Sequence, residues 1–259
     1  MENSLAKIIA VTSVKGGTGK TTTVLNLAGV YSNMGKKVLV IDFDLYSAAI
    51  SLMLNLEPTN DIYTLCEDLN NNRYEDFENY ITKYNDTIDI IAGPKDIRMS
   101  SRVNSRYIPI ILSKAALKYD VVLIDTNHFM SEINLTILEN SDKILYVITD
   151  DPIDLKNMRS MISIYKDMER DNYSILLNEP ILRNRNLSKK YDMSKFLKKD
   201  IDFYVNDKFY IKDIDNYILE GKILTLDKKI KTSYKKVMSD FKYMANSLVI
   251  NKDKEWEYG

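Results

Sequence analysis

The sequence predicts an α/β fold in which a mostly parallel sheet is covered by helices on both faces. Two observations support this prediction: short runs of β-branched residues alternate with helical segments, and most of these runs are continuously apolar. Continuous apolarity is typical of strands buried on both faces. Alternation of strand and helix favours right-handed βαβ units, which make neighbouring strands parallel. The predicted strands are residues 7–14, 37–43, 87–93, 120–126, 143–149, 172–178 and 201–205.

Helix-like segments separate these strands. The last of them, 227–250, carries an apolar stripe at helical spacing, which is more typical of a helix packed on a core than of one lying on lipid. The polar and acidic segment 55–86 is expected to form short helices on the surface between two strands. The predicted helices are residues 20–34, 107–118, 132–140, 154–170, 210–220 and 227–250.

Length and composition favour a soluble, intracellular globular protein. The chain has 259 residues and no linker or repeat, so we expect one domain over 1–259, with a core at about 7–250 and a short polar tail at 251–259. Lysine and arginine number 36 and aspartate and glutamate 37, and this balance excludes a general attraction to nucleic acid. A single cysteine, Cys66, excludes an internal disulfide and favours a reducing compartment. No apolar run approaches the roughly 20 residues that span a bilayer.

The stretch SVKGGTGKTT, residues 13–22, stands between the first strand and the first helix, which is the context of a phosphate-binding P-loop. Its glycines let backbone N–H groups approach phosphate oxygens, and the helix adds the positive end of its dipole. Lys20 is expected to reach the β- and γ-phosphates, and the Thr21 hydroxyl to ligate Mg²⁺. An ordinary glycine-rich turn fits less well, because strand, spacing, Lys-Thr pair and helix agree. The other candidate nucleotide-binding residues here are Gly16, Gly17, Thr18, Gly19 and Thr22.

The loop departs from the general P-loop pattern, because Val14 holds the first glycine position and Lys15 follows it. The stretch KGGTGKTT resembles the deviant Walker A motif, K-G-G-x-G-K-[ST], of the MinD/ParA family of P-loop ATPases. The resemblance covers roughly residues 7–250 and implies that Lys15 crosses a dimer interface to the phosphates of the partner's nucleotide. A flexible point charge there would neutralise charge that develops on the transferring phosphoryl group.

Two more strand ends resemble the family. The second strand ends in IDFD, and the resemblance implies that Asp44 positions or activates the attacking water while Asp42 supports the Mg²⁺ region. The run YDVVLIDT resembles the Walker B strand, so Asp125 is expected to hold Mg²⁺ through water. The alternative is that all three are ordinary carboxylates at strand ends.

Later loops depart from the family or add to the site. After Asp125 the family commonly has Thr-Pro-Pro, whereas this chain reads TNHFMSEIN and places His128 in the loop expected to sense the γ-phosphate. A lone loop histidine is usually a solvated polar residue. SILLNEPI resembles the strand whose terminal asparagine recognises adenine, so Asn178 is the candidate base-binding residue. Asparagine at a strand end is also a routine turn residue.

The resemblance implies a Mg²⁺-dependent ATPase that forms a homodimer with ATP, hydrolyses ATP slowly without a partner and positions a cellular structure or DNA. Too few cysteines exclude the iron–sulfur relatives. The segment that starts at Gly93-Pro94 and precedes the Walker B strand looks most like the CpaE/TadZ pilus-positioning group. Those proteins often carry a receiver-like domain before the ATPase, and because the ATPase motifs begin near residue 7 we expect none in this sequence.

Three other functions stay open. A polar landmark scaffold would bind nucleotide with little hydrolysis, and a metabolic P-loop enzyme would not need Lys15. A ParA-type ATPase would bind DNA, and the run 182–200, with seven lysines or arginines against two aspartates, would be its phosphate-contacting face in a dimer. Overall neutrality favours a solvated surface helix there instead.

The expected partners and location follow from the same resemblance. An activator or cargo protein is expected, but the sequence does not identify it. The tail 251–259 argues against direct membrane binding, because an interfacial anchor needs more cations and more apolar surface. The protein is therefore expected in the cytoplasm, concentrated at a cell pole or on the nucleoid.

Overall fold

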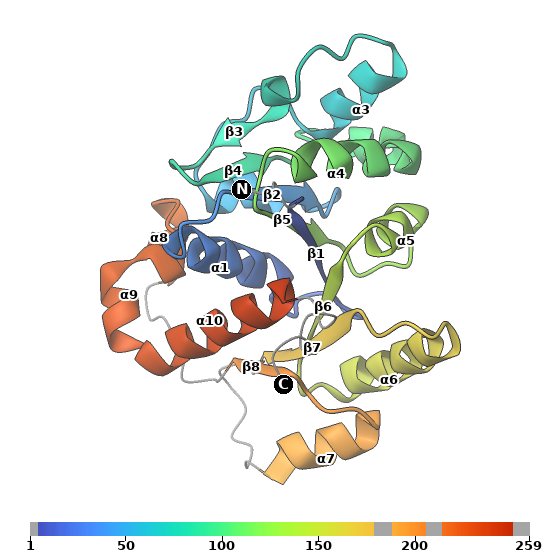
Figure 1. The fold of residues 1–259 in the computed structure, drawn as a ribbon, viewed down its shortest axis with the longest axis vertical. Helices are drawn as coiled ribbons and strands as arrows, with labels where there is room; N and C mark the ends of the chain where they lie inside the picture. Colours follow the sequence, from blue (N-terminus) through green and yellow to red (C-terminus); the bar gives the residue numbers. More distant parts are fainter. Residues whose placement is uncertain (1–4, 179–187, 206–213, 251–259) are drawn as a thin grey trace, which may run out of the picture.

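The described residues form one central eight-stranded sheet with the order β3-β4-β2-β5-β1-β6-β7-β8 (Figure 1). The computed structural model describes residues 5–178, 188–205 and 214–250. Neighbouring strands pair in parallel, except that β3 is antiparallel to β4. This confirms the predicted, mostly parallel α/β sheet. The strands are β1 (Lys7–Thr12), β2 (Val38–Phe43), β3 (Thr82–Lys83), β4 (Ile88–Ile91), β5 (Val121–Thr126), β6 (Lys143–Ile148), β7 (Tyr173–Asn178) and β8 (Phe203–Val205).

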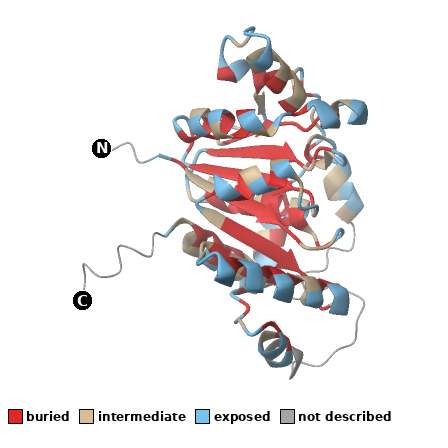
Figure 2. Ribbon diagram, turned by 90° about the vertical axis from the view of Figure 1, so that its right-hand side faces the viewer, coloured by how far each residue is buried: buried red, intermediate tan, exposed pale blue. Residues whose placement is uncertain are grey.

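Helices cover both faces of the sheet, so its strands are buried (Figure 2). Val38 and Val40 of β2 belong to the core under α1, α2 and α10, whereas Leu39 and Ile41 belong to the core under α3 to α7. Adjacent residues of one strand thus enter two different cores, which explains the continuous apolar runs. The described helices are α1 (Lys20–Asn33), α2 (Ala49–Met53), α3 (Ile62–Asn70), α4 (Ile108–Ala116), α5 (Glu132–Glu139), α6 (Pro152–Asp167), α7 (Ser188–Leu197), α8 (Ile214–Leu219), α9 (Lys228–Ser233) and α10 (Lys235–Val249), with 3-10 helices η1 (Phe77–Tyr80), η2 (Ile97–Arg102), η3 (Ser105–Tyr107) and η4 (Leu224–Leu226).

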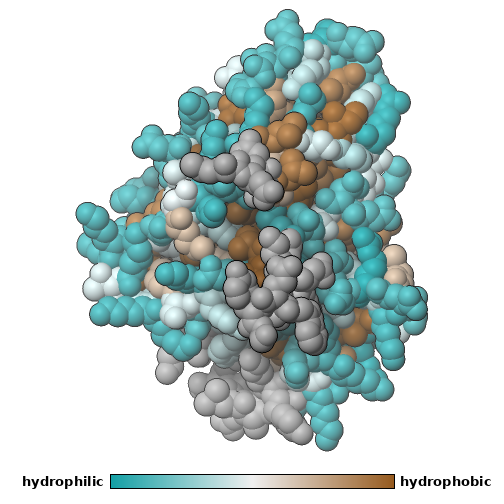
Figure 3. Space-filling model, viewed as in Figure 1, coloured by the Kyte–Doolittle hydropathy of each residue, from teal (hydrophilic) through white to brown (hydrophobic). Residues whose placement is uncertain are grey.

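The surface agrees with the polar composition. Charged residues make up 28% of the chain. On the face seen in Figure 3, hydrophilic side chains predominate and hydrophobic ones form smaller groups between them. Among the helices of the described ranges, none combines the length and the apolar character needed to cross a membrane.

The predicted helix over 227–250 is in fact two helices, α9 and α10, which meet at Tyr234. The backbone of Tyr234 has φ −116° and ψ 43°, which lies outside the helical region. The break lets Ile230 of α9 pack against Leu224, while the apolar face of α10 packs on the sheet. The prediction of one continuous helix was wrong because a stripe at helical spacing does not reveal a change of axis.

Two smaller differences concern short elements. The segment 55–86 contains α3 and η1, as expected, but it also contains β3, a two-residue strand that lacks any apolar run. The helix expected over 210–220 is described only as α8, because residues 210–213 lie outside the described ranges.

The strand order gathers the site at one edge of the sheet. β1 lies between β5 and β6, and β5 lies between β1 and β2. The carboxyl ends of these parallel strands therefore meet, and Asp42 on β2 is the direct neighbour of Asp125 on β5. Crevices at such positions of an open parallel sheet are where ligands bind.

Candidate functional site

The loop between β1 and α1 has the backbone of a phosphate cradle. Gly17 and Gly19 have φ angles of 76° and 94°, a left-handed conformation that only glycine adopts without strain. Gly19 caps α1, and its carbonyl accepts hydrogen bonds from the backbone N–H and the hydroxyl of Thr23, each at 2.9 Å. Lys20 is the first residue of α1 and is buried. The free N–H groups of a helix start and a buried lysine together favour an anion.

The Thr21 hydroxyl donates a hydrogen bond to Asp125 Oδ2 at 2.6 Å. Asp125 is buried, and its Oδ1 has no hydrogen-bond partner within the described residues. Burial raises the pKa of Asp125 to about 7, against the hydrogen bond from Thr21 and the charge of Lys20. A hydroxyl and a carboxylate with one unsatisfied oxygen fit Mg²⁺, which takes few protein ligands and completes its shell with water and phosphate oxygens.

The structure gives Asp42 a definite structural role. Its Oδ1 accepts the backbone N–H of Asp44 and its Oδ2 that of Ile50, each at 3.1 Å, so the side chain braces the loop that follows β2. Burial, and next the charge of Asp125, raise the pKa of Asp42 well above its usual range. Its part in the Mg²⁺ region stays a prediction.

Asp44 lies at the start of that loop and is only partly buried. Its charge contributes to the raised pKa values of both Asp42 and Asp125, so the three carboxylates share one environment. The structure thus brings Asp44 to the site, while its action on a water molecule stays a prediction. The sequence did not indicate Gly93, which follows β4 and packs against the loop that carries Asp44. A Cβ at position 93 would lie 2.8 Å from the Cβ of Ala48 in that loop.

Lys15 points toward the loop after β6 of its own chain. Its Nζ lies 2.9 Å from Asp151 Oδ2, and the side chains of Lys15 and Asp151 are 39% and 20% exposed. The hydrogen bond from Lys15 is the main cause that lowers the pKa of Asp151. The sequence did not indicate Asp151, because no local pattern tells which carboxylate faces a loop lysine. The action of Lys15 across a dimer stays a prediction.

His128 lies against the P-loop and is only partly exposed to solvent. A Cβ at Gly16 would be 3.3 Å from His128 Cε1, so the ring covers that glycine closely. The loop that contains His128 lacks the two prolines common in the family, and the side chain of Asn134 stabilises it instead. Asn134 Nδ2 donates to Asn127 Oδ1 and to the Phe129 carbonyl, both at 2.7 Å. The buried Asn134 was not singled out from the sequence, where it is one polar residue in a helix.

Asn178 lies at the end of β7 and also contacts the P-loop. Its Nδ2 donates to the carbonyl of Thr18 at 2.8 Å, and a Cβ at Gly19 would lie 2.5 Å from the same nitrogen. The asparagine amide has two donor hydrogens and an acceptor oxygen, so this bond uses one donor. Recognition of adenine by the remaining groups stays a prediction.

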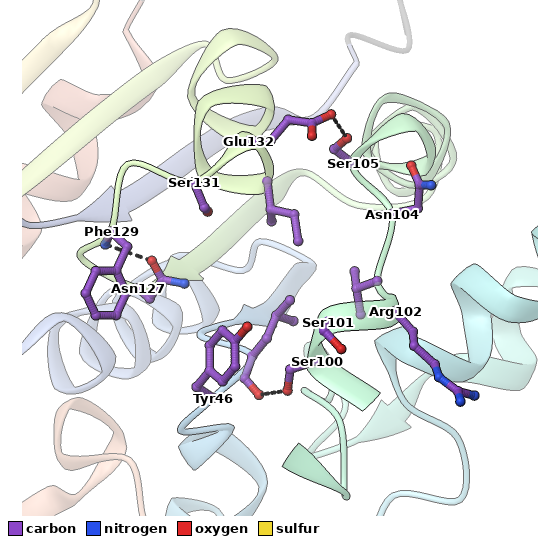
Figure 4. A pocket seen from close by; sticks show the side chains of 13 residues that line it. Tyr46, Ser100, Ser101, Arg102, Asn104, Ser105, Asn127, Phe129, Ser131 and Glu132 are labelled. Carbon is purple, nitrogen blue, oxygen red and sulfur yellow. Dashed lines mark hydrogen bonds between the residues drawn. The ribbon is translucent and has the colours of Figure 1, made fainter. Parts of the chain in front are cut away.

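A cavity of about 720 Å³ borders the site on the side of β2 and β5 (Figure 4). It lies between the loop that follows Asp44 and the loop that contains His128. Ser100 closes one wall by donating to the Leu45 carbonyl at 2.7 Å, and Ser105 donates to Glu132 Oε1 at 2.5 Å on the opposite side. The cavity therefore contacts both loops that are expected to respond to nucleotide.

Comparison with known proteins agrees with this geometry. The family model described as "AAA domain" (AAA_31) matches residues 6–177. An uncharacterized ATP-binding protein of Methanocaldococcus jannaschii is 30% identical over 142 residues, which are 55% of this chain and 52% of that protein. The septum site-determining protein MinD of Synechocystis is 31% identical over 119 residues, 46% of this chain and 44% of that protein. The chain thus spans about half the length of these relatives.

A solved structure shows the same fold. It is described as the septum site-determining protein MinD of Pyrococcus horikoshii complexed with Mg-ADP. The TM-score is 0.76 at 22% identity, and the likeness covers 95% of this chain and 96% of that one. At this identity the likeness establishes the arrangement of helices and strands.

Proposed function

The chain belongs to the MinD/ParA family of P-loop ATPases, by the AAA domain match over residues 6–177, and on this basis we propose that it is an ATP-driven dimerisation switch. It binds ATP with Mg²⁺, dimerises in that state and hydrolyses ATP slowly until a partner stimulates it. The switch positions a cellular structure or DNA, as the name of the septum site-determining relative suggests.

The contact between Thr21 and Asp125 carries this proposal. It places a hydroxyl and a half-satisfied buried carboxylate next to Lys20 at the mouth of the glycine loop. Thr21 and Asp125 would hold Mg²⁺, which when bound neutralises charge on the β- and γ-phosphates. Lys20 and the loop N–H groups bind the phosphates, and Asn178 and Thr18 fix the loop beside the base.

Hydrolysis needs a water molecule in line with the γ-phosphate and positive charge around it. Asp44 orients that water, because it is the partly exposed member of the three carboxylates. Lys15 supplies charge from the second subunit, in the way an arginine finger does. Both residues thus act on the phosphoryl group, from opposite sides of a dimer interface.

Exposed apolar side chains support an interface at this end of the sheet. Tyr46, Phe129, Met130 and Ile153 are between 56% and 62% exposed, and they follow β2, β5 and β6 at the edge where the P-loop lies. Apolar residues gathered on one exposed face are typical of an interaction surface. A second copy placed there would bring its Lys15 toward this nucleotide.

The test is nucleotide binding by the full chain. Lys20→Ala should lose at least about tenfold in affinity for ATP in the presence of Mg²⁺, because it removes a charge-assisted contact at a preformed anion site. Lys229→Ala, on the surface helix α9, is the control and should bind like the wild type. Unchanged affinity in Lys20→Ala, or no binding by the wild type, would refute the proposal.

We propose the cellular role from two segments of the sequence. The pilus-positioning role of the CpaE/TadZ group rests on the segment that begins at Gly93-Pro94. The rival ParA-type role rests on the basic run 182–200, of which residues 182–187 lie outside the described ranges, as does the whole tail 251–259. Anisotropy of labelled duplex DNA with ATP and Mg²⁺ separates these roles: salt-sensitive binding only with ATP favours partition. Turnover that no partner stimulates would favour the landmark scaffold.

A further inference from the structure

The single histidine of the chain, His128, lies where the loop after β5 meets the P-loop. A Cβ at Gly16 would be 3.3 Å from His128 Cε1 and 3.5 Å from Nδ1, so the ring packs closely against this glycine. The ring is only partly exposed, and its centroid lies 4.1 Å from that of the Phe129 ring. Among the residues that the structure describes, neither ring nitrogen has a hydrogen-bond partner.

Hydrogen bonds fix the backbone on both sides of His128. Asn127 Oδ1 accepts the backbone N–H of Phe129 at 2.9 Å, as the dashed line in Figure 4 marks. Asn134 Nδ2 donates to the Phe129 carbonyl at 2.7 Å. The side chain itself has more freedom, because His128 lines a cavity of about 210 Å³ that leaves the ring room to turn. The fold thus sets the place of His128, while the direction of its ring nitrogens can adapt.

The strand order indicates which part of a bound nucleotide lies near His128. β1 leads into the P-loop; Asn178 ends β7 on the β6 side of β1, whereas Asp125 lies at the end of β5 on the other side. With the base toward Asn178 and Mg²⁺ at Asp125, the phosphates run along the P-loop toward β5. Mg²⁺ in such sites bridges the β- and γ-phosphates. His128 follows Asp125 by three residues and therefore lies toward the terminal phosphate.

We propose that His128 is a specificity-determining residue that donates a hydrogen bond from its ring to the terminal phosphate of ATP and so favours ATP over ADP. The inference rests on the proposed function, in which the P-loop holds the nucleotide. A neutral imidazole has one N–H donor and an imidazolium has two, so the ring can donate in either state. A phosphate oxygen is a charged acceptor, which makes such a bond stronger than one between neutral groups. ADP lacks the terminal phosphate and cannot accept it.

The competing explanation is that the ring only covers Gly16 and supports the P-loop. The two explanations differ in what they predict for the two nucleotides. A ring that supports the loop acts on ATP and ADP equally, because both need the same cradle. A ring that donates to the terminal phosphate acts on ATP alone, and loss of a hydrogen bond to a charged group lowers the affinity at least about tenfold.

The test compares the affinities of the full chain for ADP and for the β,γ-imido analogue of ATP, which resists hydrolysis. Competition against a fluorescent nucleotide with Mg²⁺ gives both values. His128→Leu keeps an apolar side chain beside Gly16 but has no donor, so the preference for the analogue should fall about tenfold while the affinity for ADP stays the same. His128→Gln keeps an N–H donor and should restore most of the preference. Glu139→Gln, exposed at the end of α5, is the control and should match the wild type.

Three results would count against the inference. An unchanged preference in His128→Leu, or equal losses for both nucleotides, would leave the ring as a support of the loop. A loss of preference that disappears when the protein is diluted would assign His128 to the dimer interface instead. A wild type that binds neither nucleotide would refute the proposed function and this inference with it, whereas normal binding with an unchanged preference refutes only the role of His128.

A second readout observes the ring directly. Because the chain has a single histidine, the untagged protein gives one histidine Cε1–H signal in a ¹H–¹³C correlation spectrum. We expect this signal to move when the imido analogue and Mg²⁺ are added, and to stay near its nucleotide-free position with ADP and Mg²⁺. A signal that responds equally to both nucleotides, or to neither, would overturn the contact with the terminal phosphate.

Discussion

Thr21 donates its hydroxyl hydrogen to Asp125 across 2.6 Å, although 104 positions separate the two residues in the sequence. The bond joins the first turn of α1 to the carboxyl end of β5. Because burial raises the pKa of Asp125 to about 7, ionised Asp125 destabilises the nucleotide-free protein. A cation beside Asp125 would remove this cost, which links stability to the binding of nucleotide.

We expect the nucleotide-free protein to lose stability as the pH rises from about 4 to 7. A carboxyl whose pKa is raised by folding holds its proton more tightly in the folded state, so this stabilisation is present at low pH and is lost as the pH passes the raised value. Asp125→Asn removes this titration. The free energy of unfolding of Asp125→Asn minus that of the wild type should therefore increase by about 2 kcal/mol between pH 5.5 and 8, at roughly 1.4 kcal/mol per pKa unit.

Urea unfolding at the two pH values measures this difference. Asp240→Asn is the control, because Asp240 lies on α10 and pairs there with Lys236 far from the site. If the free energy of unfolding changed equally with pH in Asp125→Asn and the wild type, the folded protein would hold ionised Asp125 without a loss of stability.

Gly93→Ala should lower ATP turnover at least about tenfold with a smaller effect on ATP affinity. A Cβ at Gly93 would lie 2.8 Å from the Cβ of Ala48 and 3.3 Å from Cγ of Asp42, so the loop that carries Asp44 must shift. Small displacements of catalytic groups cost large factors in rate. Steady-state turnover and nucleotide titration are the measurements.

Gly35→Ala controls for a general loss of stability. Gly35 has a positive φ of 75° and no neighbour within 4 Å of an added Cβ, so its substitution strains the turn after α1 but leaves the site alone. If both variants lost turnover equally, the effect of Gly93→Ala would be one of stability and not of loop position.

The sequence predicted those parts of the fold in which each position accepts only a few residue types for a physical reason. The strands were predictable because a strand between two cores must be apolar throughout, as β2 is, and the P-loop because glycine, lysine and threonine have fixed tasks around phosphate. Parallel strand ends then bring Asp42 and Asp125 together without further information.

Contacts between distant loops were not predictable in this way. Nothing local tells which of 37 acidic residues pairs with Lys15, and Asp151 is chosen only by how α6 packs after β6. Likewise, Asn134 replaces the support of two prolines through bonds to Asn127 and Phe129 that depend on the folded loop. Tyr234 interrupts the last helix, and Ile230 of α9 packs in a different cluster from the buried residues of α10.

Asn178→Ala should weaken ATP binding and reduce discrimination between ATP and GTP. The side chain reaches the P-loop through Thr18, so its remaining hydrogen-bonding groups are well placed for the edge of a base next to that loop. Loss of a hydrogen bond in a partly buried site corresponds to roughly a tenfold loss of affinity. Competition of both nucleotides against a fluorescent ATP analogue measures the ratio.

Asn172→Ala is the matched control, since Asn172 lies just before β7 and donates to the Ser141 carbonyl at 3.2 Å, away from the P-loop. Similar affinities for ATP in Asn178→Ala and the wild type would remove Asn178 from the base-binding site and leave it as a brace of the loop.

Lys15→Ala should bind ATP through Lys20 and the loop N–H groups but fail to form a closed dimer, and its turnover should fall by orders of magnitude. Lys15→Arg should not restore full activity, because a planar fork replaces a compact charge. Asp44→Ala should bind ATP and accumulate as a dimer, since it keeps the phosphate cradle and loses the orientation of water. Size-exclusion chromatography with ATP and Mg²⁺ follows both variants.

Mixing the two inactive variants tests whether Lys15 acts across the interface. In a mixed dimer, the Lys15→Ala subunit keeps Asp44 and receives Lys15 from its Asp44→Ala partner, so one of the two sites is complete. Activity should therefore recover in part, to at most about half of the wild type per mixed dimer. If Lys15 acted on the nucleotide of its own subunit, each site would lack one residue and no activity would return. The control mixes Lys15→Ala with the double variant that carries both Lys15→Ala and Asp44→Ala. This mixture contains no complete site under either arrangement, so it gives the background activity against which recovery is judged.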